Sequence, residues 1–152
     1  MARITLLIAL SLLVVGCSAT PRTDSHTLEI RPASYEQLPG SVAYTDPYEN
    51  KTIYVSGPPI ITNKDITSAR RTKAQLYDAP AIELEVTEEA GERMLIYTKN
   101  NIQGTIAIML DGELIWSPTI MSGLSTHFVI NGGIEGLPPD QTQKILSIIK
   151  AH

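Results

Sequence analysis

The sequence predicts an α+β fold, a small two-layer sandwich in which two or three helices pack on a mainly antiparallel sheet. Residues 81–87 (AIELEVT) alternate between apolar and acidic side chains, which is the period of a half-buried strand. Asp111 and Gly112 separate two apolar runs, and this dipeptide is the strongest short signal of a hairpin. Strand and helix patterns follow one another in mixed order, which is typical of an α+β domain.

The first 16 residues have the pattern of a lipoprotein signal peptide. A short basic start precedes an apolar run over residues 4–15, which is too short to span a bilayer as a helix. The following LLVVGCSA resembles a bacterial lipobox, and it places Cys17, the only cysteine of the chain, where a lipid is attached. The alternative is a free thiol in an ordinary N-terminal membrane helix.

These features predict a protein of the bacterial cell envelope that is anchored in a membrane by lipid and faces the periplasm. Ser18 after the cysteine favours the outer membrane over the inner one. The net charge is −4, and it becomes −5 without the signal peptide, which contains only Arg3 among the charged residues. The only cluster of basic residues consists of Arg70, Arg71 and Lys73. The sequence therefore lacks the basic patch that is typical of nucleic-acid-binding proteins.

Residues 17–50 are rich in Ser, Thr, Pro and Asp, and we expect a lipidated N-terminus and an irregular tether there. Within this segment, residues 28–33 (LEIRPA) alternate well enough to form a short strand. The folded domain is expected over residues 51–152, as one unit.

In the first half of this domain we expect a strand, a helix and a second strand. KTIYV begins at residue 51 and is stopped by Gly57 and the two prolines after it. Thr62 and Asp65 have the spacing of a helix N-cap and an acid three residues later, which predicts a short helix over about 63–71. The strand at 81–87 then presents one buried and one wet face.

In the second half, Thr87 is expected to cap a helix with an acidic first turn and an apolar stripe. Two strands, 105–110 and 113–117, follow on either side of the Asp-Gly turn. Pro118 ends the second strand or marks an edge position, because proline cannot donate to a ladder. The predicted order is completed by a strand at 128–130 and an amphipathic helix after Pro138-Pro139-Asp140.

No set of residues has the spacing of a catalytic, metal or cofactor site, so we expect no enzyme, no metal and no cofactor. His26, His127 and His152 lie in an arm, a loop and the terminus, without metal-ligand spacing. The sequence contains neither a nucleophile elbow nor a phosphate-binding loop. The glutamates of residues 83–92 lie on a solvent-exposed strand face and an exposed helical turn. Contact with water is sufficient to account for charged side chains at these positions.

Asp111 is interpreted as a structural turn residue together with Gly112, because aspartate tolerates left-handed backbone geometry. The segment after this turn gives better support for a binding function than any part of the sequence gives for catalysis. Flexible apolar surfaces that contain methionine suit partner recognition, and we predict such a surface at Trp116, Ile120, Met121 and Leu124. The alternative is that Trp116 and Ile120 simply cap the core.

The stretch from Pro80 to Lys150 resembles the head subdomain of the first periplasmic domain of SecD, a subunit of the Sec protein-export machinery. In that family a strand leads to a Thr-x-x-(Ala/Gly) helix, a Thr-x-x-n-x-Gly segment and an a-I-x-L-D-G-x-x-x-x-P-x-I hairpin. The matching residues of this sequence are Thr87, Gly91, Thr98, Gly104, Ile108, Leu110, Asp111, Gly112, Pro118 and Ile120. The preceding PPIITNKDITSARR is similar to the family segment before the head, which extends the match to residues 57–150.

The resemblance implies a stand-alone head-like domain, because the six membrane helices and intramembrane acidic motifs of SecD subunits have no counterpart in this sequence. The family's last motif is also altered, at Gly136 and Asp140. In full-length relatives the head is thought to meet the emerging polypeptide. The expected partners are therefore extended or unfolded polypeptides, or components of the Sec translocon. We expect a sheet edge near Pro118 to accept a strand, with the 121–126 loop closing over it.

Two further functional classes stay open. One is an envelope structural or interaction lipoprotein that uses the fold as a scaffold for one specific folded partner, and a pull-down dominated by that partner would favour it. The other is an enzyme, which would be revealed by a turnover that Asp111→Asn or His127→Ala abolishes.

Overall fold

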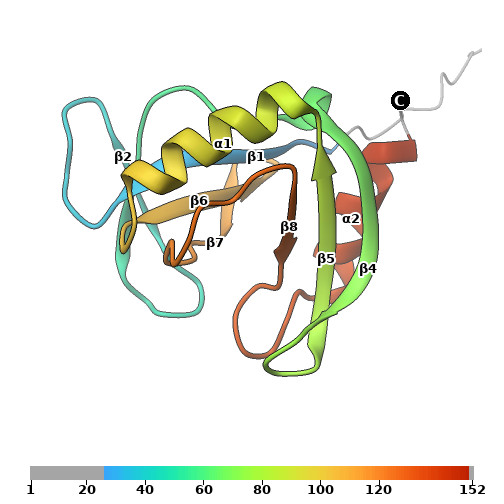
Figure 1. The fold of residues 1–152 in the computed structure, drawn as a ribbon. Helices are drawn as coiled ribbons and strands as arrows, with labels where there is room; N and C mark the ends of the chain where they lie inside the picture. Colours follow the sequence, from blue (N-terminus) through green and yellow to red (C-terminus); the bar gives the residue numbers. More distant parts are fainter. Residues whose placement is uncertain (1–25, 151–152) are drawn as a thin grey trace, which may run out of the picture.

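The computed structural model describes residues 26–150, which form two antiparallel sheets and two helices (Figure 1). The elements are β1 (Leu28–Ser34), β2 (Val42–Thr45), β3 (Thr52–Val55), the 3-10 turn η1 (Asn63–Asp65), β4 (Ile66–Ala74), β5 (Ala79–Val86), α1 (Glu88–Asn100), β6 (Thr105–Leu110), β7 (Glu113–Trp116), β8 (His127–Ile130) and α2 (Pro139–Lys150). One sheet has the strand order β2-β3-β1-β6-β7 and the other β4-β5-β8. The predicted α+β class is confirmed, although the strands lie in two sheets rather than one.

Strand β1 lies at the centre of the five-stranded sheet, where it pairs with β3 on one side and β6 on the other. Its alternation sends Leu28 and Ile30 into the core, and both side chains are fully buried. The strand predicted at 28–33 is thus confirmed, and β2 forms a hairpin with β3. The irregular tether expected over 17–50 is wrong for its described part, because two strands of the sheet lie there. Cys17 and the predicted signal peptide lie outside the described residues.

The helix expected at 63–71 is wrong, and strand β4 takes its place. The predicted cap does form, since the Thr62 N–H donates to Asp65 Oδ2 at 2.8 Å, but it closes only the single turn η1. The chain becomes extended at Ile66, and β4 then pairs with β5 from Ile66 opposite Val86 to Ala74 opposite Ala79. Pairing with a neighbouring strand therefore outweighs the local helix signal.

The two sheets and both helices share one apolar core. The strand predicted at 81–87 is confirmed as β5, whose inward residues Ile82 and Leu84 are fully buried. They belong to the same cluster as Met94 of α1 and Ile145 of α2. Helix α1 runs across the five-stranded sheet, and α2 packs beside β4 (Figure 1). Burial of each large aliphatic side chain contributes about 1.5–3 kcal/mol, so this cluster dominates the stability of the fold.

Helix α1 begins where the sequence predicts, because Thr87 Oγ1 accepts a hydrogen bond from the Ala90 N–H at 3.3 Å. Gly91 lies in the first half of the helix, where glycine lowers helix stability. A Cβ at this position would lie only 2.5 Å from Cγ2 of Thr126, in the segment that leads into β8. The glycine is therefore required by the close approach of helix and loop.

The hairpin between β6 and β7 is also confirmed. Asp111 and Gly112 have φ angles of 53° and 82°, which is the left-handed geometry that a two-residue hairpin turn needs. Strand β7 forms one edge of the five-stranded sheet, and β8 forms one edge of the three-stranded sheet. The fold places these two edges on either side of a cavity.

Replacing Gly91 by Ala is expected to lower the free energy of unfolding by about 1–3 kcal/mol, because the added methyl group overpacks the contact with Thr126. Helix propensity alone predicts the opposite, a gain of about 1 kcal/mol. Urea denaturation followed by circular dichroism measures the difference. Glu92→Ala, at an exposed position of the same helix, is the control and should change the stability by less than about 0.5 kcal/mol. A more stable Gly91→Ala variant would contradict the close packing.

Candidate functional site

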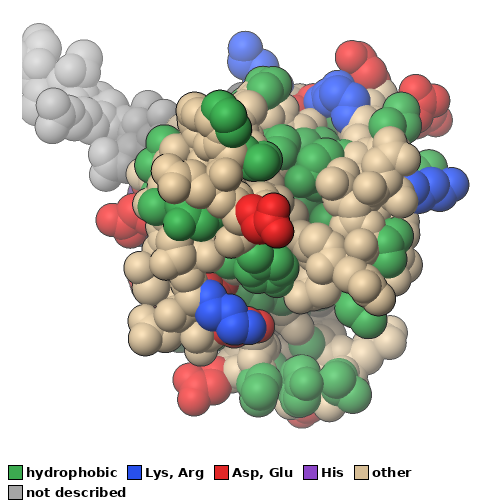
Figure 2. All heavy atoms as spheres, turned by 90° about the vertical axis from the view of Figure 1, so that its left-hand side faces the viewer, with side chains coloured by type: hydrophobic (Ala, Val, Ile, Leu, Met, Phe, Trp, Pro, Cys, Tyr) green, Lys and Arg blue, Asp and Glu red, His purple; other side chains and the backbone are tan. Residues whose placement is uncertain are grey.

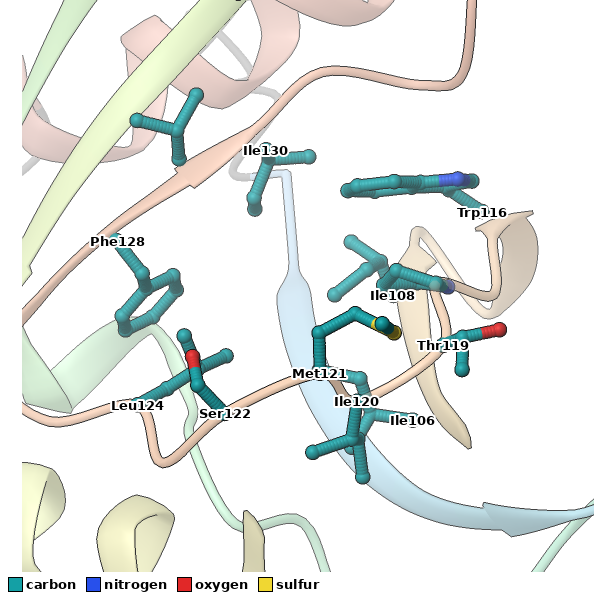
Figure 3. Close-up of a pocket in the computed structure, with 12 residues that line it drawn as sticks. Ile106, Ile108, Trp116, Thr119, Ile120, Met121, Ser122, Leu124, Phe128 and Ile130 are labelled. Carbon is teal, nitrogen blue, oxygen red and sulfur yellow. The ribbon is translucent and has the colours of Figure 1, made fainter. Parts of the chain in front are cut away.

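A cavity of about 190 Å³ opens between the edges of the two sheets. Its walls come from β6, from Trp116 at the end of β7, from the 118–124 segment and from β8. Hydroxyl groups enter at Thr119 and Ser122, and the remaining lining is aliphatic or aromatic, with no charged side chain. Figure 3 shows side chains from both sheets converging on this space. The cavity and its rim are called the Trp116 groove below.

The structure brings together all four residues predicted for partner binding, at different depths of the Trp116 groove. Ile120 is 3% exposed and belongs mainly to the core, whereas its neighbour Met121 is 79% exposed. Trp116 and Leu124 are half-buried and pack against the core while facing the groove. The Trp116 ring points across the groove toward Ile130 of β8 (Figure 3). Only part of this surface therefore serves the core.

Trp116 also borders two further hollows, one over the outer face of the three-stranded sheet and one beside the β2–β3 turn. Among residues 26–150, eleven large hydrophobic side chains are exposed, and six of them line the groove or these hollows. The six are Tyr48, Leu76, Tyr77, Met121, Val129 and Ile134. Figure 2 shows one face of the molecule, on which hydrophobic side chains lie in a central hollow and also on the raised parts around it. Apolar surface gathered in this way is typical of interaction sites.

The 121–126 loop is fastened to helix α1. The Leu124 N–H donates to Thr98 Oγ1 at 2.9 Å, and this hydroxyl in turn donates to the Met94 carbonyl at 2.7 Å. Thr98 is fully buried, so both bonds are shielded from water. On the other side of the loop, the Ile120 N–H donates to the Gly104 carbonyl at 2.9 Å. Met121 is thus an exposed side chain on a backbone that is held at both ends.

A buried carboxylate binds Ser117, the residue after Trp116. Asp46, just after β2, is 2% exposed, and its Oδ2 accepts a hydrogen bond from the hydroxyl of Ser117. Its Oδ1 accepts bonds from the N–H groups of Tyr48 and Glu49, each at 2.8 Å. Because β2 and β7 are opposite edges of one sheet, this contact shows that the sheet curls until its edges meet. Burial raises the pKa of Asp46, but the hydrogen bonds outweigh burial and leave this pKa below its ordinary value.

Asp111 does more than form a turn. Its Oδ1 accepts the Thr27 N–H at 2.9 Å, and its Oδ2 lies 2.9 Å from His26 Nδ1 and 3.5 Å from Lys144 Nζ of α2. Burial raises the pKa of Asp111, but the bonds from Thr27 and His26 outweigh it and lower this pKa. The carboxylate therefore fastens the start of β1 to the hairpin and to the last helix.

Two further pairs of titratable groups lie on the three-stranded sheet. Glu83 binds Arg70 through two bonds of 3.0 and 2.7 Å, and His127 Nε2 lies 3.4 Å from Glu85 Oε1. Within residues 26–150 no group of three or more His, Cys, Asp and Glu side chains is placed to hold a metal ion. His152 lies outside the described residues.

Sequence reasoning missed the opposite wall of the groove. The sequence pattern predicts only a short strand at residues 128–130, and it places Asp46 in an irregular segment. The alternation of β8 marks Phe128 and Ile130 as inward residues, but it does not show that they face Trp116. That relation exists only because the two sheets pack on one core.

Residues 26–150 thus form a small α+β domain whose two antiparallel sheets leave an apolar groove between their edges. A family model described as SecDF, P1 head subdomain, matches residues 40–146, which is more than half of the chain. The chain belongs to this family, and so it contains a domain related to a protein-export subunit.

Particular relatives agree with this assignment. The chain is 32% identical over 81 residues to the protein translocase subunit SecDF of Thermus thermophilus, which covers 53% of this chain and 10% of that protein. The chain therefore spans about a tenth of this curated relative. A solved structure titled as a membrane component SecDF that enhances protein export has a TM-score of 0.58 at 20% identity, over 84% of this chain and 63% of that one.

A second solved structure, SecDF in a super-membrane-facing form, has a TM-score of 0.58 at 22% identity, over 84% of this chain and 19% of that one. At these identities the structural likeness shows the fold. No helix within residues 26–150 is long and apolar enough to cross a membrane.

Asp46→Asn is expected to lower the free energy of unfolding at pH 7 by about 1–3 kcal/mol, because a buried hydrogen-bonded carboxylate is replaced. Since the folded-state pKa lies below the ordinary 3.8, ionised Asp46 stabilises the fold above that pH, and this contribution is lost as the pH falls through the folded-state pKa. The variant should therefore lose less stability than the wild type between about pH 5 and pH 2.

Urea denaturation at a series of pH values measures this slope, with emission of the single tryptophan beside Ser117 as the signal. Glu36→Gln, at an exposed position, is the control and should leave the slope unchanged. Equal slopes for Asp46→Asn and wild type would show that Asp46 is not the group responsible.

Proposed function

We propose that this protein is a non-enzymatic lipoprotein of the cell envelope whose head domain binds polypeptide partners in the Trp116 groove, on the periplasmic side of the membrane, in support of protein export. The observation that carries the proposal is an uncharged apolar groove between two strand edges, with Trp116 and Met121 presented at its rim.

The chemistry of the Trp116 groove suits apolar segments of varied sequence. Trp116 offers a large rigid face, and the unbranched side chain of Met121 adapts to different shapes. The backbone that carries Met121 is held by hydrogen bonds at both ends, which lowers the entropy lost on binding. An extended or unfolded polypeptide supplies apolar side chains in the form that such a groove accepts.

The relatives support the connection with export, since one is titled a translocase subunit and another a membrane component that enhances protein export. Components of the Sec translocon are therefore the second group of partners that this proposal includes. A scaffold for one folded envelope protein is the alternative function, and the exposed apolar side chains outside the groove, such as Leu76 and Ile134, favour it.

The proposal predicts that Trp116→Ser and Met121→Ser each weaken the binding of an unfolded polypeptide, and together by at least roughly tenfold, because truncated aromatic anchors cost about 2 kcal/mol or more. Residues 18–152 would be titrated into a fluorescently labelled, permanently unfolded polypeptide, and anisotropy measured. Ile96→Ser, which removes an exposed apolar side chain of α1 away from the groove, is the matched control. Circular dichroism verifies that each variant is folded.

Binding that is equal in the Trp116→Ser/Met121→Ser variant and in Ile96→Ser would refute the groove as the site. An absence of any binding to unfolded polypeptides, together with a pull-down dominated by one folded envelope protein, would favour the scaffold function instead.

Lipid attachment is tested separately. In bacteria grown with a radiolabelled or alkyne-tagged palmitate, the wild-type chain is expected to incorporate label and to sediment with membranes, because two or more acyl chains anchor a protein stably. Cys17→Ser should lose both properties, whereas Ser18→Ala should keep them. Label that persists in Cys17→Ser would refute the assignment.

A further inference from the structure

We propose that the polypeptide bound in the Trp116 groove is an added strand that pairs with the free edge of β8 and extends the β4-β5-β8 sheet by one strand. This inference rests on the proposed function and specifies the contact that recognises the partner, namely the main chain of β8 rather than apolar side chains alone.

The hydrogen-bond pattern of β5 and β8 shows which backbone groups are available. The Val86 N–H donates to the Thr126 carbonyl at 2.9 Å, directly before His127 pairs with Glu85. Since hydrogen-bonded and non-hydrogen-bonded pairs alternate in an antiparallel ladder, the N–H and C=O groups of Phe128 and Ile130 point toward β5. Those of His127 and Val129 point away from it, toward the open edge.

The other edge of the groove is closed to such pairing. Beyond β7, the carboxylate of Asp46 accepts a hydrogen bond from the hydroxyl of Ser117. The next residue, Pro118, has no N–H to offer. Strand addition near Pro118, which the sequence led us to expect, therefore lacks a backbone donor at this residue, and the open edge is that of β8.

The far edge of the three-stranded sheet also carries the features that block strand addition. Strand β4 has an irregularity between Ile66 and Ser68 and contains Arg70, Arg71 and Lys73. Helix α2 packs against it, and Arg71 reaches Gln143 of that helix at 3.3 Å. Bulges, charges and covering helices are the usual protections of an edge strand, whereas β8 pairs with β5 without a bulge and contains no Asp, Glu, Lys or Arg.

The geometry of the edge defines the chemistry of the bound segment. The residue opposite Val129 would lie on the outer face of the sheet, beside Trp116 and the hollow that the two residues share. Its two neighbours would point to the inner face, where Phe128 and Ile130 line an uncharged cavity. The segment thus needs apolar residues at i−1 and i+1 and a small or polar residue at i.

Charge further restricts the segment. The hollow beside the β2–β3 turn contains Asp46 and Glu49, the hollow shared by Trp116 and Val129 contains one lysine and one glutamate, and the chain as a whole has a net charge of −4. Acidic flanking residues would be repelled, and basic or neutral ones accepted. The partner is therefore an extended segment of alternating apolar residues with neutral or basic flanks and no proline opposite β8.

The test uses the acetylated and amidated peptide Lys-Thr-Val-Thr-Val-Thr-Lys and the chain from residue 18 onward, labelled with ¹⁵N. In the free protein, amide hydrogen exchange should be slow at Phe128 and Ile130 and fast at Val129. Saturation with the peptide should slow exchange at Val129 by at least about tenfold, because its N–H becomes hydrogen-bonded. Emission of Trp116 reports occupancy of the groove independently of the backbone.

Backbone-methylated peptides separate main-chain from side-chain recognition. Methyl groups on the nitrogens of the three threonines remove the donors that face β8, and affinity should fall by about tenfold or more. Methyl groups on the two valine nitrogens, which point away from β8, are the matched control and should change affinity much less. Both peptides keep every side chain.

The outcomes are distinct. Slowed exchange at Val129 with selective loss from threonine methylation supports strand addition. A Trp116 response with unchanged exchange at Val129, or equal effects of the two methylations, overturns strand addition and leaves the proposed function standing. No binding of this peptide or of any unfolded polypeptide overturns both. Slow exchange at Val129 without peptide, in a chain that sediments as a dimer, overturns the inference because a second copy occupies the edge.

Discussion

The pairing of β1 with β6 is the contact on which the rest of the molecule depends. The two strands are aligned over six residue pairs, from Leu28 opposite Leu110 to Ala33 opposite Thr105. The alignment is extended by the Asp111 N–H, which donates to the Thr27 carbonyl at 2.8 Å, and by the Asp111 carboxylate, which accepts the Thr27 N–H. Because β1 also pairs with β3, these two strands form the centre of the larger sheet, to which β2 attaches through β3 and β7 through β6.

The location of the groove follows from that register. Strand β6 holds β7 through a two-residue turn, so Trp116 is set opposite Ile108 at a defined point of the sheet. The curl that brings Asp46 to Ser117 closes the sheet beyond Trp116. Strand β8 is placed independently, through β5, and it approaches from the other sheet. The apolar space between β7 and β8 is therefore the junction of two separately specified sheets.

The elements that the sequence predicts correctly are those whose determinants are local. The cap at Thr87, the Asp111-Gly112 turn and the alternation of residues 81–87 each lie within a few residues, and all three agree with the structure. The helix expected at 63–71 fails because Ile66 pairs with Val86, twenty positions away in the chain, a contact that a local pattern does not encode.

The same reasoning separates the two walls of the candidate site. Trp116, Ile120, Met121 and Leu124 are close in sequence, so an apolar cluster was predictable there, whereas their relation to Val129 depends on how the sheets pack. The bond between Asp46 and Ser117 joins residues 71 positions apart, in a segment whose composition is typical of a tether. This bond joins the ends of β2 and β7, which are placed relative to one another by the strands between them. It can therefore be predicted only after the register of β1 with its neighbours is known.

The exposure of Met121 bears on the choice between a groove that binds and a groove that only closes the core. A side chain that closes a core is itself buried, as Ile120 is at 3%. Met121 follows it directly on a backbone held by hydrogen bonds and remains 79% exposed. Burial of apolar area is favourable by about 25 cal/mol per Å², so a purely structural loop would gain stability by turning this side chain inward. The outward position of this apolar residue beside the edge of β8 is the observation on which the proposed contact with a partner rests.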